Sequence, residues 1–100
     1  MIEVTRDGAV AVVSFHRPPH NHADLALLEA IGAAFAAADD DPDCRAIVLR
    51  SEGRVFCAGA DLVAANPVAD GVPAEGRNPF YVAASRLFAV QTPVVAAVQG

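Results

Sequence analysis

The sequence predicts an α/β domain with a parallel sheet at its core, and three observations support this fold class. Residues 9–15, 45–50 and 94–98 are short and almost wholly apolar, which is typical of strands buried on both faces. Two segments with helical spacing of apolar residues lie between them, and a strand–helix–strand order implies parallel pairing through a right-handed crossover. Hydrophobic residues make up 54% of the 100-residue chain and charged residues 19%, a composition that excludes intrinsic disorder.

The chain begins with a second strand candidate, residues 2–6, next to the strand at 9–15. Asp7-Gly8 lies between the two, and glycine adopts the positive φ angles that tight hairpin turns require. We therefore expect an antiparallel hairpin ahead of the parallel strands.

A loop with Pro18 and Pro19 then interrupts regular structure, and the first helix follows it. Either Asn21 or Asp24 can cap this helix. Three aspartates at 39–41 end it, and we interpret them as a solvated helix end rather than a cation site. The apolar residues of its buried face are Leu27, Leu28, Ile31, Ala34, Phe35 and Ala38.

The strand at 45–50 leads into a turn rich in small residues and then into a long loop at 66–79 that holds three prolines and two glycines. A second helix is expected over 80–90, and the strand at 94–98 closes the order of elements. The helical spacing in this second helix comes from Phe80, Ala84, Leu87 and Phe88.

Charge and composition exclude several classes of function. The formal net charge is −5, so the chain lacks the basic surface of a nucleic-acid-binding protein, and we expect no nucleic-acid partner. All seven basic residues are arginine, which excludes a Walker lysine or a Schiff-base lysine in this stretch. The sequence has neither a signal-peptide pattern nor an apolar run long enough to span a membrane. We expect a cytoplasmic protein with no membrane partner and with free thiols at both cysteines.

Most clusters of reactive residues favour ordinary explanations. His16, His20 and His22 lie close together, but no acid or cysteine ligand shares their loop, so we expect solvated or substrate-facing histidines and no metal site. The serines lack the context of a nucleophile elbow, which argues against a hydrolase triad. We expect Cys57 to be a buried, inert thiol.

Residues 55–62 are the most informative stretch of the chain. They follow a predicted buried strand, as ligand loops do in α/β sheets, and the small residues between Cys57 and Ala60 let a ligand approach the backbone. Free backbone N–H groups in such a turn can bind an oxyanion. From the residues alone, a ligand-binding turn and an ordinary turn around Gly59 remain equal alternatives.

Three segments of the chain resemble the enoyl-CoA hydratase/isomerase (crotonase) superfamily. They are residues 12–18 followed by Asn21, residues 43–49 leading into 56–62, and residues 92–100. The resemblance covers the whole chain and implies a spiral of ββα units with a parallel sheet core, incomplete in this chain. Residues 1–100 would then be the N-terminal part of a single crotonase-like domain whose C-terminal part is absent.

The resemblance implies an oxyanion hole that binds the carbonyl oxygen of an acyl-CoA thioester. Ala60 would supply its first backbone N–H, and this is the one catalytic position that the resemblance assigns here. Asp61 would fix the turn and cap a short helix, a role that we favour over direct catalysis.

The resemblance also implies further contacts to the substrate. Ala58, Gly59 and Leu62 would line the path of the CoA and the acyl group, and His20 and His22 would contact the adenine and pantetheine of CoA. Coenzyme A is part of the substrate in this family, so no separate cofactor is expected.

The second oxyanion donor and the proton-transferring acids of the family would lie beyond Gly100. One hypothesis is therefore that a full-length parent, a homotrimer or hexamer, hydrates or isomerises enoyl-CoA through a stabilised enolate, and that this chain alone is inactive. Hydrolysis, decarboxylation or dehalogenation of other acyl-CoAs stays open for the parent. The alternative is a stand-alone, non-catalytic protein that binds CoA thioesters or assembles with a relative, so whether this chain is an enzyme stays open.

Overall fold

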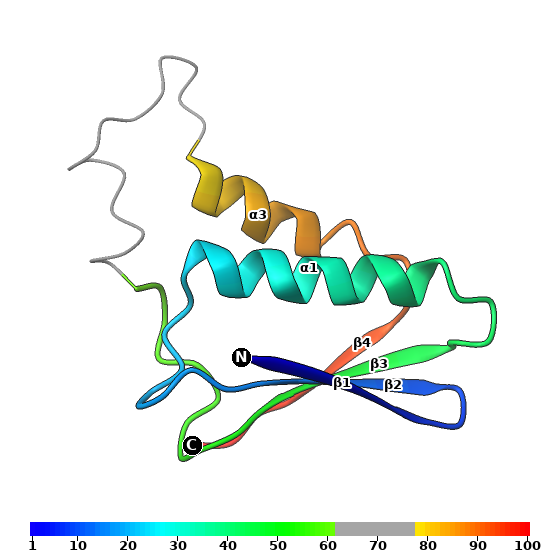
Figure 1. The fold of residues 1–100 in the computed structure, drawn as a ribbon, viewed down its shortest axis with the longest axis horizontal. Coiled ribbons are helices and arrows are strands. Elements are labelled where there is room, and N and C mark those ends of the chain that lie inside the picture. Colours follow the sequence, from blue (N-terminus) through cyan, green and yellow to red (C-terminus); the bar gives the residue numbers. More distant parts are fainter. Residues whose placement is uncertain (62–77) are drawn as a thin grey trace.

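A computed structural model describes residues 1–61 and 78–100. In these two ranges, four strands form one mixed sheet in the order β1-β2-β3-β4, and two helices lie together on one side of it (Figure 1). The predicted α/β class is thus confirmed, with a parallel core and one antiparallel edge strand. The elements in chain order are β1 (Ile2–Asp7), β2 (Val10–Phe15), α1 (Leu25–Asp39), β3 (Ala46–Ser51), α3 (Pro79–Leu87) and β4 (Val94–Ala97).

The expected hairpin joins β1 and β2, which pair antiparallel. Asp7 pairs with Val10 across the hairpin, so Asp7 belongs to the strand and the turn consists of Gly8 and Ala9, one residue later than predicted. Gly8 has a φ of 59°, the left-handed conformation that such a two-residue turn requires.

The core lies between α1 and the sheet. β2 and β4 both pair in parallel with β3, as predicted, and the alternate β2 residues Ala11, Val13 and Phe15 are buried in this layer. Val13, Leu27 and Ile47 are buried almost completely at the centre of this layer. The expected apolar face of α1 is confirmed, with Ala34 only partly buried, and the buried residues of the helix are Leu27, Leu28, Ile31, Phe35 and Ala38.

Asp24 caps α1, which settles the choice between two predicted caps. Its side chain accepts a hydrogen bond of 2.8 Å from the backbone N–H of Leu27. Asn21 lies before the helix and has a different role, described below.

The aspartates at the end of α1 are exposed or partly exposed, as expected of a solvated helix end, and two of them also make specific contacts. Asp39 accepts hydrogen bonds from the backbone N–H groups of Gln91 and Thr92 and from the Thr92 hydroxyl. Asp41 pairs with Arg6 at 2.8 Å. These contacts tie the end of α1 to the start of β4 and to β1.

The structure corrects the predicted burial of β4 and the predicted extent and burial of the second helix. All four residues of β4 are exposed, because β4 is an edge strand with β3 as its one neighbour in the described part of the chain. The second helix ends at Leu87 instead of residue 90, and Phe88, predicted on its apolar face, is 90% exposed. α3 packs on α1 instead of the sheet, so it needs only a small contact surface, and Ala83 is its buried residue. Most of the long loop expected at 66–79 lies outside the described residues.

Candidate oxyanion site

The carboxyl ends of the three parallel strands meet at one edge of the sheet, and the candidate site lies there. Phe15 and Ser51 are paired last residues of β2 and β3, and β4 ends beside them. The segments that follow, residues 16–24, 52–61 and 98–100, therefore come together at this edge, where α/β proteins bind ligands.

The turn at residues 59–61 is held against the segment before α1 by a single parallel bridge between Ala23 and Ala60. The N–H of Ala23 donates to the carbonyl of Gly59 at 2.8 Å, and the N–H of Asp61 donates to the carbonyl of Ala23 at 2.8 Å. Because N–H groups alternate in direction along an extended chain, the Ala60 N–H points away from Ala23. No described residue accepts a hydrogen bond from it, and Ala60 is exposed. With respect to residues 1–61 and 78–100, Ala60 thus presents a donor without an acceptor and with a fixed direction, as an oxyanion site needs.

Gly59 makes this turn possible, because its φ of 114° lies in the region that side chains rarely allow. Space does not explain the glycine, since a Cβ there would meet no atom within 4 Å. The requirement is one of backbone conformation.

Asn21 organises the base of the same loop and was missed as a site residue by sequence reasoning. It is only 1% exposed and has a φ of 55°. Its amide nitrogen donates to the carbonyls of Glu52 at 2.7 Å and Val55 at 2.9 Å, and its oxygen accepts from the Arg17 N–H at 2.6 Å. The one available signal was its place in the motif after residues 12–18, together with the tendency of asparagine to adopt positive φ.

Arg17 is the second residue that sequence reasoning missed. Its guanidinium lies 2.9 Å from the Asp61 carboxylate and 3.4 Å from that of Asp24, and it donates to the His22 carbonyl at 2.9 Å. Asp61 is predicted to fix the turn, and this ion pair gives Arg17 as a partner for that role.

The end of the chain packs on the same loop. The Gln99 carbonyl accepts from the Phe56 N–H at 3.0 Å, and the Gln99 side chain donates to the carbonyls of Ser51 and Gly53. A Cβ on Gly100 would lie 2.7 Å from the Arg54 carbonyl oxygen, so only glycine fits this close approach.

The other predicted site residues lie near the turn, except for one that the structure does not describe. His20 is exposed and accepts from the Ala58 N–H through its carbonyl at 3.1 Å, and its ring lies 6.1 Å from that of His22, edge to face. Ala58 and Gly59 are exposed beside Ala60. Leu62 lies outside the described residues.

The thiols differ in their surroundings. Cys44 is buried and Cys57 is exposed, and both are free. The expectation of a buried Cys57 is therefore wrong, because this residue lies in a loop at the protein surface. Within residues 1–61 and 78–100, no three histidine, cysteine or acidic side chains are grouped as a metal site would require.

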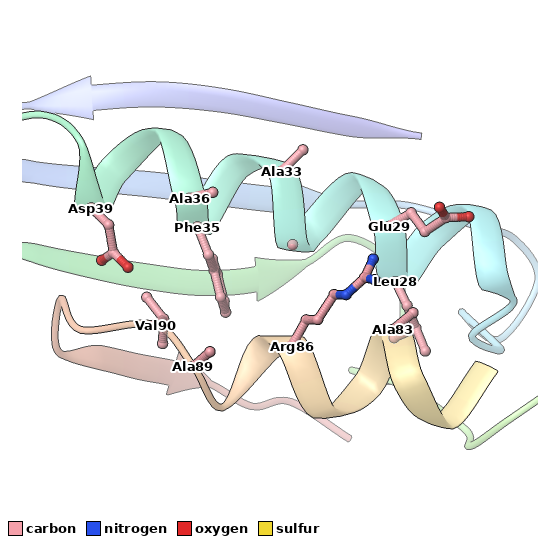
Figure 2. A pocket seen from close by; sticks show the side chains of 11 residues that line it. Leu28, Glu29, Ala33, Phe35, Ala36, Asp39, Ala83, Arg86, Ala89 and Val90 are labelled. Carbon is pink, nitrogen blue, oxygen red and sulfur yellow. The ribbon is translucent and has the colours of Figure 1, made fainter. Parts of the chain in front are cut away.

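A groove of about 370 Å³ between α1 and α3 lies apart from this edge (Figure 2). Figure 2 shows Glu29, Ala83 and Arg86 toward one end of the groove and Asp39 at the other, with Phe35 between them. It contains none of the predicted site residues, so its volume does not belong to the oxyanion site. Neither α1 nor α3, the helices that the structure describes, is long and apolar enough to cross a membrane.

The fold and the turn together define an α/β protein with a candidate oxyanion donor at the carboxyl edge of a parallel sheet. Comparison with known proteins gives the family. The family model for enoyl-CoA hydratase/isomerase matches residues 5–100. The chain belongs to this family, the crotonase superfamily, and matches an N-terminal portion of it.

Individual relatives agree with the family match. A protein named as a probable enoyl-CoA hydratase in Mycobacterium bovis is 34% identical over 99% of this chain and 38% of its own length. A carnitinyl-CoA dehydratase of Salmonella arizonae is also 34% identical, with the same coverage of 99% and 38%. The chain therefore spans well under half the length of the curated relatives it matches.

Solved structures place the fold in the same superfamily. An enoyl-CoA hydratase subunit of Geobacillus kaustophilus matches with a TM-score of 0.79 at 34% identity, over 99% of this chain and 38% of that one. An enoyl-CoA hydratase/carnitine racemase of Magnetospirillum magneticum matches with a TM-score of 0.78 at 26% identity, over 99% and 39%. The described elements are thus part of a crotonase fold.

Proposed function

We propose that this chain forms the acyl-CoA thioester-binding part of an enzyme that hydrates or isomerises enoyl-CoA, with the Ala60 N–H as its first oxyanion donor. The observation that carries the proposal is the Ala60 N–H itself, which is directed by the bridge to Ala23 and has no acceptor among the described residues. Family membership and the names of the relatives support a CoA thioester as the ligand.

The chemistry of such a site explains the need for the donor. When a thioester forms an enolate, negative charge develops on the carbonyl oxygen, and a fixed N–H stabilises it more strongly than it stabilises the neutral carbonyl. Proton transfer also needs a side chain of suitable pKa within reach of the substrate. We propose that a longer parent supplies this side chain and the second donor beyond Gly100, and that residues 1–100 alone bind without turnover.

The remaining expectations of the resemblance belong to the same proposal. They are that coenzyme A enters with the substrate and no other cofactor is used, that the parent is a homotrimer or hexamer, and that it works in the cytoplasm. The substrate-binding residues besides Ala60 are proposed to be His20, His22, Ala58, Gly59, Asp61 and Leu62.

The experiment compares two ligands that differ only in having a carbonyl or a methylene group next to the sulfur. Calorimetry measures the affinity of the chain for butyryl-CoA, a thioester, and for S-butyl-CoA, a thioether without the carbonyl. One hydrogen bond to the carbonyl predicts about two- to tenfold tighter binding of the thioester. Ala60→Pro removes the N–H and should abolish this preference while leaving the affinity for the thioether.

Cys57→Pro provides the matched control. It places a proline in the same exposed loop, at a residue whose N–H makes no hydrogen bond to any other described residue. This variant should keep the preference for the thioester. Equal affinity of the unmodified chain for both ligands, or loss of the preference in both variants, would contradict the assignment of Ala60.

A second candidate function, a non-catalytic protein that assembles with a relative, draws support from the exposed apolar edge of β4. The two candidates differ in their binding partner. Thioester-selective binding supports the first, whereas association through β4 without any preference between the two ligands supports the second.

A further inference from the structure

The bridge between Ala23 and Ala60 is too small to hold a turn by itself. It consists of two backbone hydrogen bonds between segments that are otherwise outside the sheet. An isolated pair of short segments is marginal in water, so a further contact must hold the direction of the Ala60 N–H.

Arg17 contacts both sides of this bridge. On one side its guanidinium binds the His22 carbonyl and the Asp24 carboxylate, which belong to the residues directly before and after Ala23. On the other side it binds the carboxylate of Asp61, the residue directly after Ala60, at 2.9 Å. One planar group thus joins the two strands of the bridge.

The backbone of Arg17 is itself fixed. Its N–H donates to the buried side chain of Asn21 at 2.6 Å, and its carbonyl accepts from the Asn21 N–H at 2.8 Å. The guanidinium therefore starts from an anchored position, and less conformational freedom is lost when it makes its three contacts.

The charges of the three side chains also favour this arrangement. Asp24 and Asp61 both lie within 3.4 Å of the same guanidinium, so their carboxylates are brought close together. Without the cation they would repel each other and drive the two strands of the bridge apart. A lysine would restore the charge, but its single ammonium group lacks the fork that bonds several acceptors at once.

We infer that Arg17 is a positioning residue that holds the Ala60 N–H in its direction toward the thioester oxygen. This inference rests on the proposed function of Ala60. Arg17 itself does not touch the reacting atoms, and it acts through Asp61 and the segment around Ala23.

The effect on stability is expected to be small. The side chains of Arg17, Asp24 and Asp61 are 30%, 23% and 22% exposed. Ion pairs at such partly exposed positions contribute little to the free energy of unfolding. The test therefore needs readouts that a purely structural role would not change.

The experiment uses the whole chain with Arg17→Met and Arg17→Lys, and NMR measures the hydrogen exchange of the Asp61 amide. That amide donates to the Ala23 carbonyl, so it reports directly on the bridge. Arg17→Met should raise its exchange rate about fivefold or more and bring the preference for butyryl-CoA over S-butyl-CoA close to one. Arg17→Lys should fall between the Met variant and the unmodified chain.

Two further variants exclude simpler explanations. Arg6→Met removes another arginine–aspartate pair, the 2.8 Å contact with Asp41 at the opposite end of the parallel strands. It should change neither the exchange of the Asp61 amide nor the preference for the thioester. Adding Asp61→Asn to Arg17→Met removes the repulsion between the two carboxylates and should restore part of the protection of the Asp61 amide.

The outcomes separate this inference from the function on which it rests. Unchanged exchange at Asp61 in Arg17→Met, or an equal increase in Arg6→Met, would overturn the role of Arg17. Equal binding of both ligands by the unmodified chain would instead overturn the donor role of Ala60.

Discussion

At the scale of single residues, Asn21 shows how a buried polar group can determine a loop. Its amide uses both N–H donors and its oxygen in hydrogen bonds of 2.6–2.9 Å, and its backbone adopts a positive φ that asparagine tolerates better than most residues. It joins the loop before α1 to the loop after β3, so the start of the candidate site depends on this one side chain.

Asn21→Asp is expected to destabilise the protein by about 3 kcal/mol. The new carboxylate would face the carbonyls of Glu52 and Val55, which lose the amide donors of Asn21 and meet a buried negative charge instead. Urea unfolding measures the loss. Asn78→Asp is the matched control, because Asn78 is also buried but caps α3 by accepting from the Phe80 N–H, a role that aspartate performs equally well. A loss at Asn21 no larger than the loss at Asn78 would contradict this account.

The hydrogen bonds of Asp39 predict that the stability of the fold falls at acidic pH. Hydrogen bonds from the Thr92 hydroxyl and from the backbone N–H groups of Gln91 and Thr92 lower the pKa of the Asp39 carboxyl. Because the pKa is lower in the folded than in the unfolded chain, the ionised carboxylate stabilises the fold above pH about 3.9, and this contribution is lost as pH falls through the folded pKa.

Asp39→Asn should therefore weaken the fall in stability as the pH drops below about 4, as followed by urea unfolding at each pH. Asp40→Asn changes the neighbouring exposed residue, whose side chain makes no hydrogen bond or ion pair within the described part of the chain, and should leave the fall unchanged. Parallel pH profiles for the unmodified chain and Asp39→Asn would show that these hydrogen bonds do not favour the charged form.

Local patterns in the sequence identified the residues around Ala60 but missed Arg17 and Asn21. The turn at 58–61 is visible in a short run of small residues, whereas Arg17 and Asn21 act through contacts with residues 52–61, far along the chain. Nothing in a single sequence shows which distant carbonyl or carboxylate such a side chain will meet, so these roles needed the three-dimensional structure.

At the scale of whole elements, periodicity predicted where helices and strands form but not which neighbours cover them. α1 has the predicted buried face because it lies on the sheet. β4 has an equally apolar sequence but is exposed, because burial depends on a neighbour that its own residues do not specify. The same reasoning applies to Phe88, which follows a helix that packs on α1 alone.

Two substitutions with the same chemistry test this difference between strands. Val13→Ala in β2 deletes methyl groups that are fully buried and should cost about 2 kcal/mol of unfolding free energy. Val95→Ala in β4 changes a side chain that is 61% exposed and should cost about 0.5 kcal/mol or less in dilute solution. Urea unfolding at low protein concentration measures both, and similar losses would indicate that β4 is covered.

At the scale of the whole molecule, the two edges of the sheet differ in their protection. β1 carries Glu3, Arg6 and Asp7 along one edge, and charged residues of this kind discourage pairing with another chain. β4 forms the other edge with two valines and two alanines, and exposed Val98 follows it. No described strand pairs with its outer side, so this edge is open to pairing in the described part of the chain.

The direction of the backbone groups in β4 identifies which of them face outward. The Pro93 carbonyl accepts from Ile47 of β3 at 2.8 Å, so Pro93 faces β3. Because direction alternates along a strand, Val95 and Ala97 also face β3, whereas the N–H groups of Val94 and Ala96 face away from the sheet. A partner strand on this edge would form its hydrogen bonds with the backbone of Val94 and Ala96.

The chain of residues 1–100 is therefore expected to self-associate through β4 at high concentration, and sedimentation velocity over a hundredfold range of concentration measures this. Ala96→Pro removes an outward N–H without removing a hydrogen bond to β3, so it should keep the fold and abolish association. Ala97→Pro removes an inward N–H and should instead lower stability. If Ala96→Pro associates as strongly as the unmodified chain, another surface is responsible, and the support that β4 gives to an assembly function is lost.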